Sequence, residues 1–324
     1  MDFLTESFLF DKTRIDGPVL VTGAGGCIGS WVLAILSRSA ISCVAFDLVD
    51  DRRRPSLVMG PSNAADLAWE IGDIADGGNL KNIIERHKIR SIIHLAGLQV
   101  PFCKADPATG ARVNVEGTVN ILEAARQAGI MRTVYASSVA ALGMPVGGPY
   151  MATLYGAYKL ANEYTAEVYF QDWKVPSVGI RPNIVYGLAR DQGMTSKCTV
   201  AMHAAVMGHS YEVPYSGLTS WLYAGEAAAA FIAAVARDGD GAYQFNLNGS
   251  AETVETGMKI VCDLVGDIDV TIAGTPLPFP PDLDDTPIRK HVGDYPSISV
   301  HRGIGDTCRA FQELNDAGQL EVPR

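Results

Sequence analysis

Short hydrophobic runs alternate with amphipathic stretches along the first two-thirds of the chain. The runs have the length of strands, and they read PVLVTG, ISCVAFD, LAWEIGD, IRSIIHLAG, MRTVYASS and VPSVGIRP. The stretches between them have helical character; one begins near Ile28, and others read LKNIIERHK, VNVEGTVNILEAARQAG and YGAYKLANEYTAEVYF. Strands separated by helices of this length predict an α/β fold, in which a parallel sheet with right-handed crossovers is covered on both faces.

Three glycines follow the first hydrophobic run. In TGAGGCIG, Gly23, Gly26 and Gly29 lie at three-residue intervals between a strand and a helix. Glycine lets the backbone turn tightly and approach a diphosphate, which the free N–H groups at a helix N-terminus stabilise. Glycine-rich turns are common in sheets, but the strand before this one and the helix after it predict a dinucleotide site in a Rossmann-type, doubly wound parallel sheet.

An aspartate at the end of the second strand bears on the choice of dinucleotide. Asp47 stands 18 residues beyond Gly29, close to the ~20 expected for an acid that binds the adenosine ribose hydroxyls. The alternative interpretation is that Asp47 is an ordinary solvent-exposed aspartate at the end of a strand. A carboxylate there would repel a ribose 2′-phosphate, which favours NAD. The run Arg52 to Arg54 keeps NADP open, although such runs are more often solvated loops.

The alternation of strands and helices weakens after Gly187. A proline-rich loop follows at 275–287, and the last third reads as short helices and strands that close a cleft. We therefore expect a dinucleotide-binding domain at 1–187, joined by about 216–246. A smaller C-terminal lobe of residues 188–215 and 247–324 would bind the substrate.

Composition and charge exclude several classes of protein. The net charge of −10 argues against a nucleic-acid partner, which needs a basic face. No CxxC pair occurs among the six cysteines, and His94 lacks companions at metal-ligand spacing, so we predict no metal site and read His94 as a core histidine. The apolar run at 227–236 is half a membrane span and predicts a buried helix. The N-terminus lacks the pattern of a signal peptide, so we expect a cytoplasmic protein.

A tyrosine and a lysine share one face of a predicted helix. Lys159 follows Tyr155 by four residues, and of the 12 tyrosines only Tyr155 has a lysine at that spacing. Both are ordinary residues on helix surfaces, so the spacing alone does not decide between a surface pair and a functional one.

Taken together, these segments resemble the extended short-chain dehydrogenase/reductase superfamily, which includes nucleotide-sugar epimerases and dehydratases. The resemblance runs from about Pro18 to near Gly239. Its motifs occur in the family's order, and they are the glycine turn, GDI at 72–74, HLAG at 94–97, NVEGT at 114–118, ASSVAALG at 136–143, YGAYK at 155–159 and RPNIVYG at 181–187.

The resemblance implies a role for four polar residues. Tyr155 would be the general acid/base, and Lys159 would lower its pKa from about 10 and hold the nicotinamide ribose. Ser138 would orient the reacting oxygen. Asn114 either completes a proton relay through Lys159 and water or packs as a helix amide. The implied cofactor-binding residues are Gly23, Gly26, Cys27, Ile28, Gly29, Asp47, Asp73, Ile74, Leu95, Ala96, Gly97, Tyr155, Lys159 and Pro182.

The substrate would lie beyond the carboxyl ends of the strands, where ligands of such sheets bind. Gln99 and Phe102 follow the fourth predicted strand and are candidate substrate residues, together with Ser138. Met144 would line the pocket from the short connection between Ser138 and Tyr155.

Differences between this chain and the motifs of its family reduce the number of reactions that we expect it to catalyse. The acidic pair of the dehydratases is replaced by Val139 and Ala140, so dehydration is not expected. The epimerases usually have an asparagine where Ile184 stands and an arginine where the chain has Thr219 and Ser220. A nucleotide diphosphate needs guanidinium groups, and this lobe offers few. The chief candidates are Arg190, Arg289 and Arg302.

The leading interpretation is an NAD-dependent oxidoreductase acting on a small secondary alcohol or ketone, such as a sugar, a sugar acid or a hydroxy acid. The alternatives are an NAD-dependent 4-epimerase of a nucleotide sugar and a non-catalytic NAD-binding redox sensor. The resemblance also predicts a homodimer that forms through the helices around 105–128 and 155–172, since the second has apolar residues on more than one face.

Overall fold

A seven-stranded parallel sheet forms the centre of the molecule. The computed structural model describes residues 2–143, 151–266 and 269–322. The sheet has the order β10-β6-β5-β4-β1-β2-β3, and every neighbouring pair is parallel. Its strands are β1 (Val19–Thr22), β2 (Cys43–Asp47), β3 (Ala68–Ile71), β4 (Ser91–His94), β5 (Thr133–Ala136), β6 (Ser177–Pro182) and β10 (Ala242–Leu247). The chain winds outward in both directions from β1 and β4, which confirms the doubly wound α/β fold.

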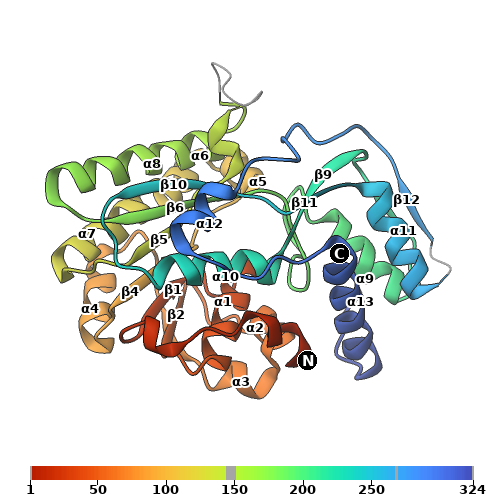
Figure 1. Ribbon diagram of the computed structural model, residues 1–324, viewed down its shortest axis with the longest axis horizontal. Coiled ribbons are helices and arrows are strands. Elements are labelled where there is room, and N and C mark those ends of the chain that lie inside the picture. The colour runs from red at the N-terminus through yellow and green to blue at the C-terminus, as the bar shows by residue number, and fades with distance from the viewer. Residues whose placement is uncertain (1, 144–150, 267–268, 323–324) are drawn as a thin grey trace.

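Helices cover both faces of this sheet, as Figure 1 shows. One face carries α4 (Gly77–His87), α7 (Gly117–Ala128) and α8 (Leu154–Trp173), and the other carries α1 (Cys27–Arg38) and α10 (Ala224–Val235). Because both faces are covered, the central strands β1 and β4 are buried along their whole length. Every residue of α10 is buried too, as its apolar sequence predicts. Among the described residues, no helix is both long and apolar enough to cross a membrane.

Several short elements surround the sheet without a clear signal in the sequence. The connections contain α2 (Arg53–Met59), α3 (Pro61–Ala65), α5 (Val100–Ala105), α6 (Pro107–Ala111), a π-helical turn η4 (Arg112–Glu116) and a 3₁₀ turn η5 (Val139–Leu142). The N-terminal segment forms the 3₁₀ turns η1 (Asp2–Leu4), η2 (Glu6–Phe8) and η3 (Lys12–Arg14). The π-helical turn lies beside the cavity described below, as such turns often do at functional sites.

The remaining elements form a second group, drawn at the right of Figure 1. Its strands are β7 (Val185–Tyr186), β8 (Tyr211–Val213), β9 (Leu218–Tyr223), β11 (Ser250–Thr253) and β12 (Val270–Ile272), which pair as β11-β9-β7 and β12-β8. Its helices are α9 (Lys197–Val206), α11 (Val254–Val265) and α13 (Val300–Asp316). Buried rings join the two groups, because Trp31 of α1 packs on Tyr223 at 5.2 Å between ring centroids. The division of the chain into two domains stays a proposal.

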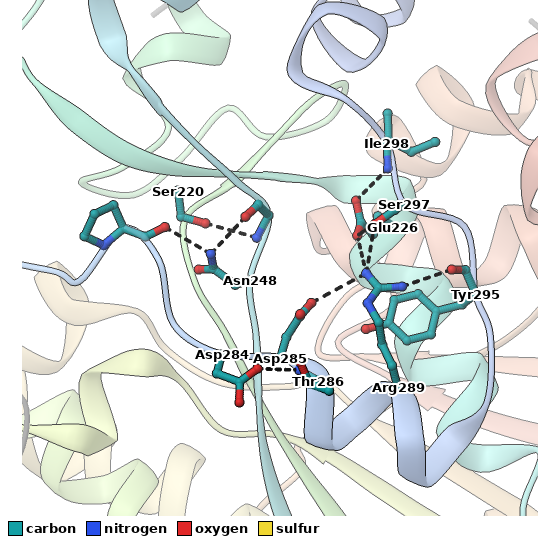
Figure 2. A network of polar contacts seen from close by, with 12 residues as sticks. Ser220, Glu226, Asn248, Asp284, Asp285, Thr286, Arg289, Tyr295, Ser297 and Ile298 are labelled. Atoms are coloured by element: carbon teal, nitrogen blue, oxygen red, sulfur yellow. Dashed lines mark hydrogen bonds and ion pairs between the residues drawn. The ribbon is translucent and has the colours of Figure 1, made fainter.

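A C-terminal strap, defined here as residues 275–298, crosses from the second group back to the sheet and contains α12 (Thr286–Val292). Figure 2 shows the polar network that holds it. Glu226 of α10 is buried, and its carboxylate accepts hydrogen bonds from Arg289 at 2.9 Å and from the Ile298 backbone at 3.0 Å. Asn248 donates to the Pro281 carbonyl at 3.0 Å. The strap is therefore fixed to α10 and to the end of β10.

Candidate active site

One large cavity lies beyond the carboxyl ends of the parallel strands, at the point where the strand order reverses between β1 and β4. Its volume is about 580 Å³. It is bordered by every predicted cofactor residue, and also by Ser138, Gln99 and Phe102. Open α/β sheets bind their ligands at such a reversal. The structure thus brings together residues that lie up to 159 positions apart, from Gly23 to Pro182.

Two positions of the glycine turn, Gly23 and Gly29, leave no room for a side chain. Gly23 has φ +70°, and a Cβ there would lie 2.6 Å from the backbone N of Ala96. A Cβ on Gly29 would lie 2.3 Å from the Gly23 carbonyl oxygen. Helix α1 begins after Gly26 without a side-chain cap, so its first N–H groups are free to bind an anion. This cradle fits the diphosphate of a dinucleotide.

Asp47 lies at the predicted adenosine end of the cavity. Its carboxylate accepts hydrogen bonds from the backbone N–H groups of Gly25 and Leu48, each at 2.8 Å. Burial raises the pKa of Asp47, while these two N–H groups act in the opposite direction. Asp73 and Ile74 border the same end, and Asp73 also accepts from Arg112 at 2.8 Å.

The three consecutive arginines have separate roles. Arg52 binds Asp50 and the carbonyls of residues 64, 65 and 67, and Arg53 pairs with Asp51 at 2.7 Å. Arg54 alone of the three borders the cavity. It donates to the Gly25 carbonyl at 3.0 Å and pairs with Asp191 at 2.8 Å.

Tyr155 and Ser138 stand together at the other end of the cavity. Tyr155 is in the first turn of α8, where the Thr153 hydroxyl accepts from the Gly156 N–H at 3.0 Å and caps the helix. Burial raises the pKa of Tyr155, and a hydrogen bond with Ser138 and the charge of Arg190 oppose that rise. The predicted lowering of this pKa by Lys159 is therefore not found, because desolvation of the phenolate is the larger effect.

Lys159 is one turn further along α8 and is almost fully buried. Its Nζ lies 5.5 Å from the centroid of the Tyr155 ring and donates to the Ala136 carbonyl at 2.7 Å. Burial lowers the pKa of Lys159 to about 8, since its charge is costly away from water. The lysine is placed to hold a cofactor ribose, as expected, while its charge near pH 8 is only partial.

Asn114 lies behind Lys159 in the π-helical turn and does not border the cavity. Its Nδ2 donates to the carbonyls of Leu98 and Gly110, which is the behaviour of a packing amide. Its Oδ1 is buried without a hydrogen-bond partner among the described residues, and both this atom and the Lys159 Nζ border Gly97. The structure is therefore compatible with both predicted roles of Asn114, the proton relay and the packing amide.

The neighbouring Ser137 also borders the cavity, but its hydroxyl belongs to a different hydrogen-bond network. Its hydroxyl donates to Glu163, which is buried and forms a two-fold ion pair with Arg181 at 2.6 and 2.7 Å. His94 is likewise hydrogen-bonded on both ring nitrogens, to Thr22 at 2.7 Å and Thr118 at 3.2 Å. These contacts confirm that His94 is a satisfied core histidine.

Gln99 and Phe102 border the cavity where a substrate would lie, whereas Met144 falls outside the described residues. Sequence reasoning missed other residues of this region, which are Asn183, Gln192, Met194, Thr195 and Phe279. The epimerases carry an asparagine where this chain has Ile184, and this chain has an asparagine one position earlier. Asn183 precedes Ile184, and its Oδ1 is buried without a partner among the described residues.

The three arginines proposed as diphosphate ligands separate in the structure. Arg289 is taken up by Glu226 and Ser297 in the strap network of Figure 2. Arg302 on α13 donates to Ser7 at 2.5 Å. Only Arg190 of the three borders the cavity. This overturns the idea that Arg289 and Arg302 could serve a bound diphosphate, because their side chains stabilise the fold elsewhere.

Comparison with known proteins gives a consistent group of relatives. Residues 19–247 match the model of the family described as NAD dependent epimerase/dehydratase. A UDP-glucose 4-epimerase of Mycolicibacterium smegmatis is 28% identical over 90% of this chain and 98% of that protein.

Two solved structures share the fold over nearly their whole length. A UDP-glucose 4-epimerase of Thermus thermophilus, in complex with NAD, is 24% identical, with a TM-score of 0.74 over 91% of this chain and 99% of that one. An L-threonine dehydrogenase of Cupriavidus necator is 22% identical, with a TM-score of 0.76 over the same shares. Epimerases and dehydrogenases are thus both built on this fold.

Proposed function

Because the chain belongs to the NAD-dependent epimerase/dehydratase family of extended short-chain dehydrogenases/reductases, we propose that it is an NAD-dependent dehydrogenase of a small secondary alcohol. One observation carries the choice of a small substrate over a nucleotide sugar. Of the arginines available for a diphosphate, Arg190 alone borders the substrate end of the cavity among the described residues, and the same cavity must also hold the dinucleotide. Two phosphates would need more guanidinium contacts than this.

The residues of the cavity divide into cofactor and substrate groups. The turn from Gly23 to Gly29 and the N-terminus of α1 would hold the diphosphate of NAD, Asp47 the adenosine ribose and Lys159 the nicotinamide ribose. Bound NAD supplies hydride transfer to or from the carbon that carries the substrate oxygen. Leu95 to Gly97 and Pro182 would border the dinucleotide from the ends of β4 and β6.

The proton transfer at the substrate oxygen is assigned to Tyr155. Ser138 hydrogen-bonds the tyrosine and would fix the position of the reacting oxygen beside it. Burial keeps the phenol protonated at neutral pH, so Tyr155 is ready to donate a proton when a carbonyl is reduced. In the opposite direction it must first lose that proton, and the rate of alcohol oxidation should rise with pH.

A nucleotide-sugar 4-epimerase is the second candidate. It is favoured by the M. smegmatis relative, which bears that name and matches this chain along nearly its entire length. Asn183 supports it as well, since this residue borders the cavity next to the position where the epimerases carry asparagine, and its amide oxygen has no partner among the described residues.

The two candidates differ in what happens to the cofactor. The purified protein would be incubated with NAD and a panel of sugars, aldonates, uronates and hydroxy acids while nicotinamide absorbance is followed. A dehydrogenase releases NADH in proportion to the substrate consumed. Interconversion of UDP- or GDP-sugars without any net absorbance change would contradict the dehydrogenase proposal and support the epimerase. Binding of NAD without either reaction would support the redox sensor.

We also propose a homodimer that forms through α7 and α8. Tyr164 and Val168 stand one turn apart on α8 and expose 61% and 46% of their surface, and Leu154 exposes 44%. Light scattering should give twice the chain mass, and Val168→Asp should shift the protein toward a monomer. A monomeric wild-type protein at micromolar concentration contradicts the proposal. The cytoplasmic location stays a prediction of the sequence.

A further inference from the structure

A positively charged side chain that has no counterion among the described residues borders the substrate end of the cavity. Arg190 donates through Nη2 to the Thr195 hydroxyl at 3.2 Å, and its Nε is buried without a hydrogen-bond partner in the part of the chain that the structure describes. Among the described residues it forms no ion pair, because the adjacent Asp191 pairs with Arg54 instead. A partly buried guanidinium that lacks an anion is costly, so its presence needs a reason.

The charges around the cavity are divided between its two ends. The described acids that border it, Asp47, Asp51 and Asp73, all follow β2 or β3 at the adenosine end. None of the described residues that border the substrate end is acidic. In a chain of net charge −10, this end therefore presents a local positive charge.

The backbone fixes the direction of this arginine. Ala189, directly before it, has φ +71°, a left-handed conformation that is uncommon for any residue except glycine. The preceding Leu188 carbonyl accepts from the Trp31 indole at 2.9 Å, and the Arg190 N–H donates to the Gly187 carbonyl at 3.0 Å. Backbone strain of this kind persists where the surroundings hold it, and it is concentrated at binding sites.

The Arg190 guanidinium is near a predicted substrate residue and acts electrostatically on Tyr155. Its charge opposes the rise that burial causes in the pKa of Tyr155. Its Nη2 and the Gln99 Oε1 both border Gly193, which places it beside a predicted substrate residue. A planar guanidinium matches a carboxylate through two parallel hydrogen bonds.

We propose that Arg190 binds a carboxylate of the substrate, which makes the substrate a small hydroxy acid rather than a neutral alcohol or sugar. This inference rests on the proposed dehydrogenase function. The acid's hydroxyl would meet Tyr155 and Ser138 while its carboxylate meets Arg190. The guanidinium also favours the tyrosinate needed for oxidation, so one residue would bind the substrate and assist the proton transfer.

The test compares acids with their reduced partners. The pairs would be D-gluconate and D-glucitol, D-glucuronate and D-glucose, and L-lactate and propane-1,2-diol, each with saturating NAD. We expect kcat/KM for an acid to exceed that of its neutral partner by at least about 100-fold. Arg190→Met should raise KM for the acid by about 30-fold or more and leave the KM of any neutral substrate unchanged.

Two further variants and a binding measurement keep the result decisive. Arg190→Lys keeps the positive charge but cannot form two parallel hydrogen bonds to a carboxylate. Its KM for the acid should therefore lie between those of the wild type and Arg190→Met. Arg86→Met, which removes a surface arginine paired with Glu70, should change neither parameter. Equal turnover of acids and neutral partners overturns the inference. So does a loss of NAD affinity in Arg190→Met as large as the loss of acid affinity, which would make the cofactor diphosphate its ligand.

Failure of the dehydrogenase proposal would be visible separately. If no member of any pair yields NADH, the proposed reaction is wrong. Calorimetry of the protein–NADH complex with the same three acids then decides the carboxylate site alone. Binding that Arg190→Met abolishes supports the site, and absence of binding overturns it.

Discussion

Tyr155 carries the most direct prediction at the scale of single residues. Tyr155→Phe removes one oxygen and keeps the ring that packs near Lys159. Turnover should fall by about 10²–10⁴-fold, because a positioned acid/base is lost, while NAD affinity and melting temperature stay close to the wild type. In the wild type, the rate of oxidation should still be rising toward pH 10, since burial raises the pKa of this phenol. Near-full activity in the variant would exclude Tyr155 as the acid/base.

Lys159 links the same site to stability. Burial lowers its pKa from 10.5 to about 8, so between these values the unfolded chain binds more protons than the folded chain. The free energy of unfolding contributed by this lysine must therefore rise with pH in that window. Relative to Lys159→Met, the wild type should gain about 2 kcal/mol between pH 8 and pH 10. Urea unfolding at both pH values measures the gain; a constant difference would mean that the ammonium is solvated.

Asp47 should set the preference between the two dinucleotides. Calorimetry should find NAD bound at least about tenfold more tightly than NADP, a difference of about 1.4 kcal/mol, because the half-buried carboxylate of Asp47 repels the 2′-phosphate. Asp47→Ala should narrow the gap. Arg54, the one member of the arginine run at the cavity, would be responsible if NADP bound as well as NAD.

Residues near the glycine turn were predictable because each follows a motif of fixed spacing. Phe279 was not, since its role depends on where a loop returns after many residues of chain, and Asn183 was overlooked although it directly follows the predicted Pro182. The pKa of Tyr155 was predicted in the wrong direction for a related reason. Spacing along a helix shows which charge is near, but burial is visible only once the surrounding elements are placed.

At the scale of elements, the C-terminal strap makes a testable contribution. Arg289 compensates the buried charge of Glu226, whose pKa is raised by burial. Arg289→Met should lower the free energy of unfolding by about 3 kcal/mol at pH 8, because a buried carboxylate is left unpaired. The cost should shrink at lower pH as Glu226 takes up a proton.

The double variant Glu226→Leu with Arg289→Met is the control for this network. It removes both charges and should recover much of the lost stability. Since the strap carries Phe279 to the cavity, the single variant should also raise the substrate KM. Urea unfolding measures these changes. If the loss of unfolding free energy in the double variant equals the sum of the losses in the two single variants, the two side chains do not interact.

Six of the seven strands of the sheet were predicted from hydrophobic runs, and their order along the chain was correct, whereas β10 was not predicted as a strand. The runs overestimated strand lengths; IRSIIHLAG forms a strand only at Ser91–His94, after which the chain turns to border the cavity. The helices α2 and α5 gave no periodic signal, because helices of seven and six residues are too short for one. Their positions are set by packing.

At the scale of the whole molecule, the ion pair of Arg54 with Asp191 joins α2 to the segment around residues 190–192, and both segments contribute residues that border the dinucleotide cavity. Asp191 exposes 57% of its side chain, so the pair is weak, worth at most about 1 kcal/mol, and is screened by salt. A cofactor held behind so weak a contact should have a short residence time. That suits an enzyme that must exchange NADH for NAD in every catalytic cycle, whereas an epimerase can retain one molecule over many cycles. Stopped-flow fluorescence should show NADH dissociating faster at 0.5 M salt and in Asp191→Asn, with little further effect of salt on the variant. Dissociation that is slow and indifferent to both changes would mark a cofactor kept for the life of the protein.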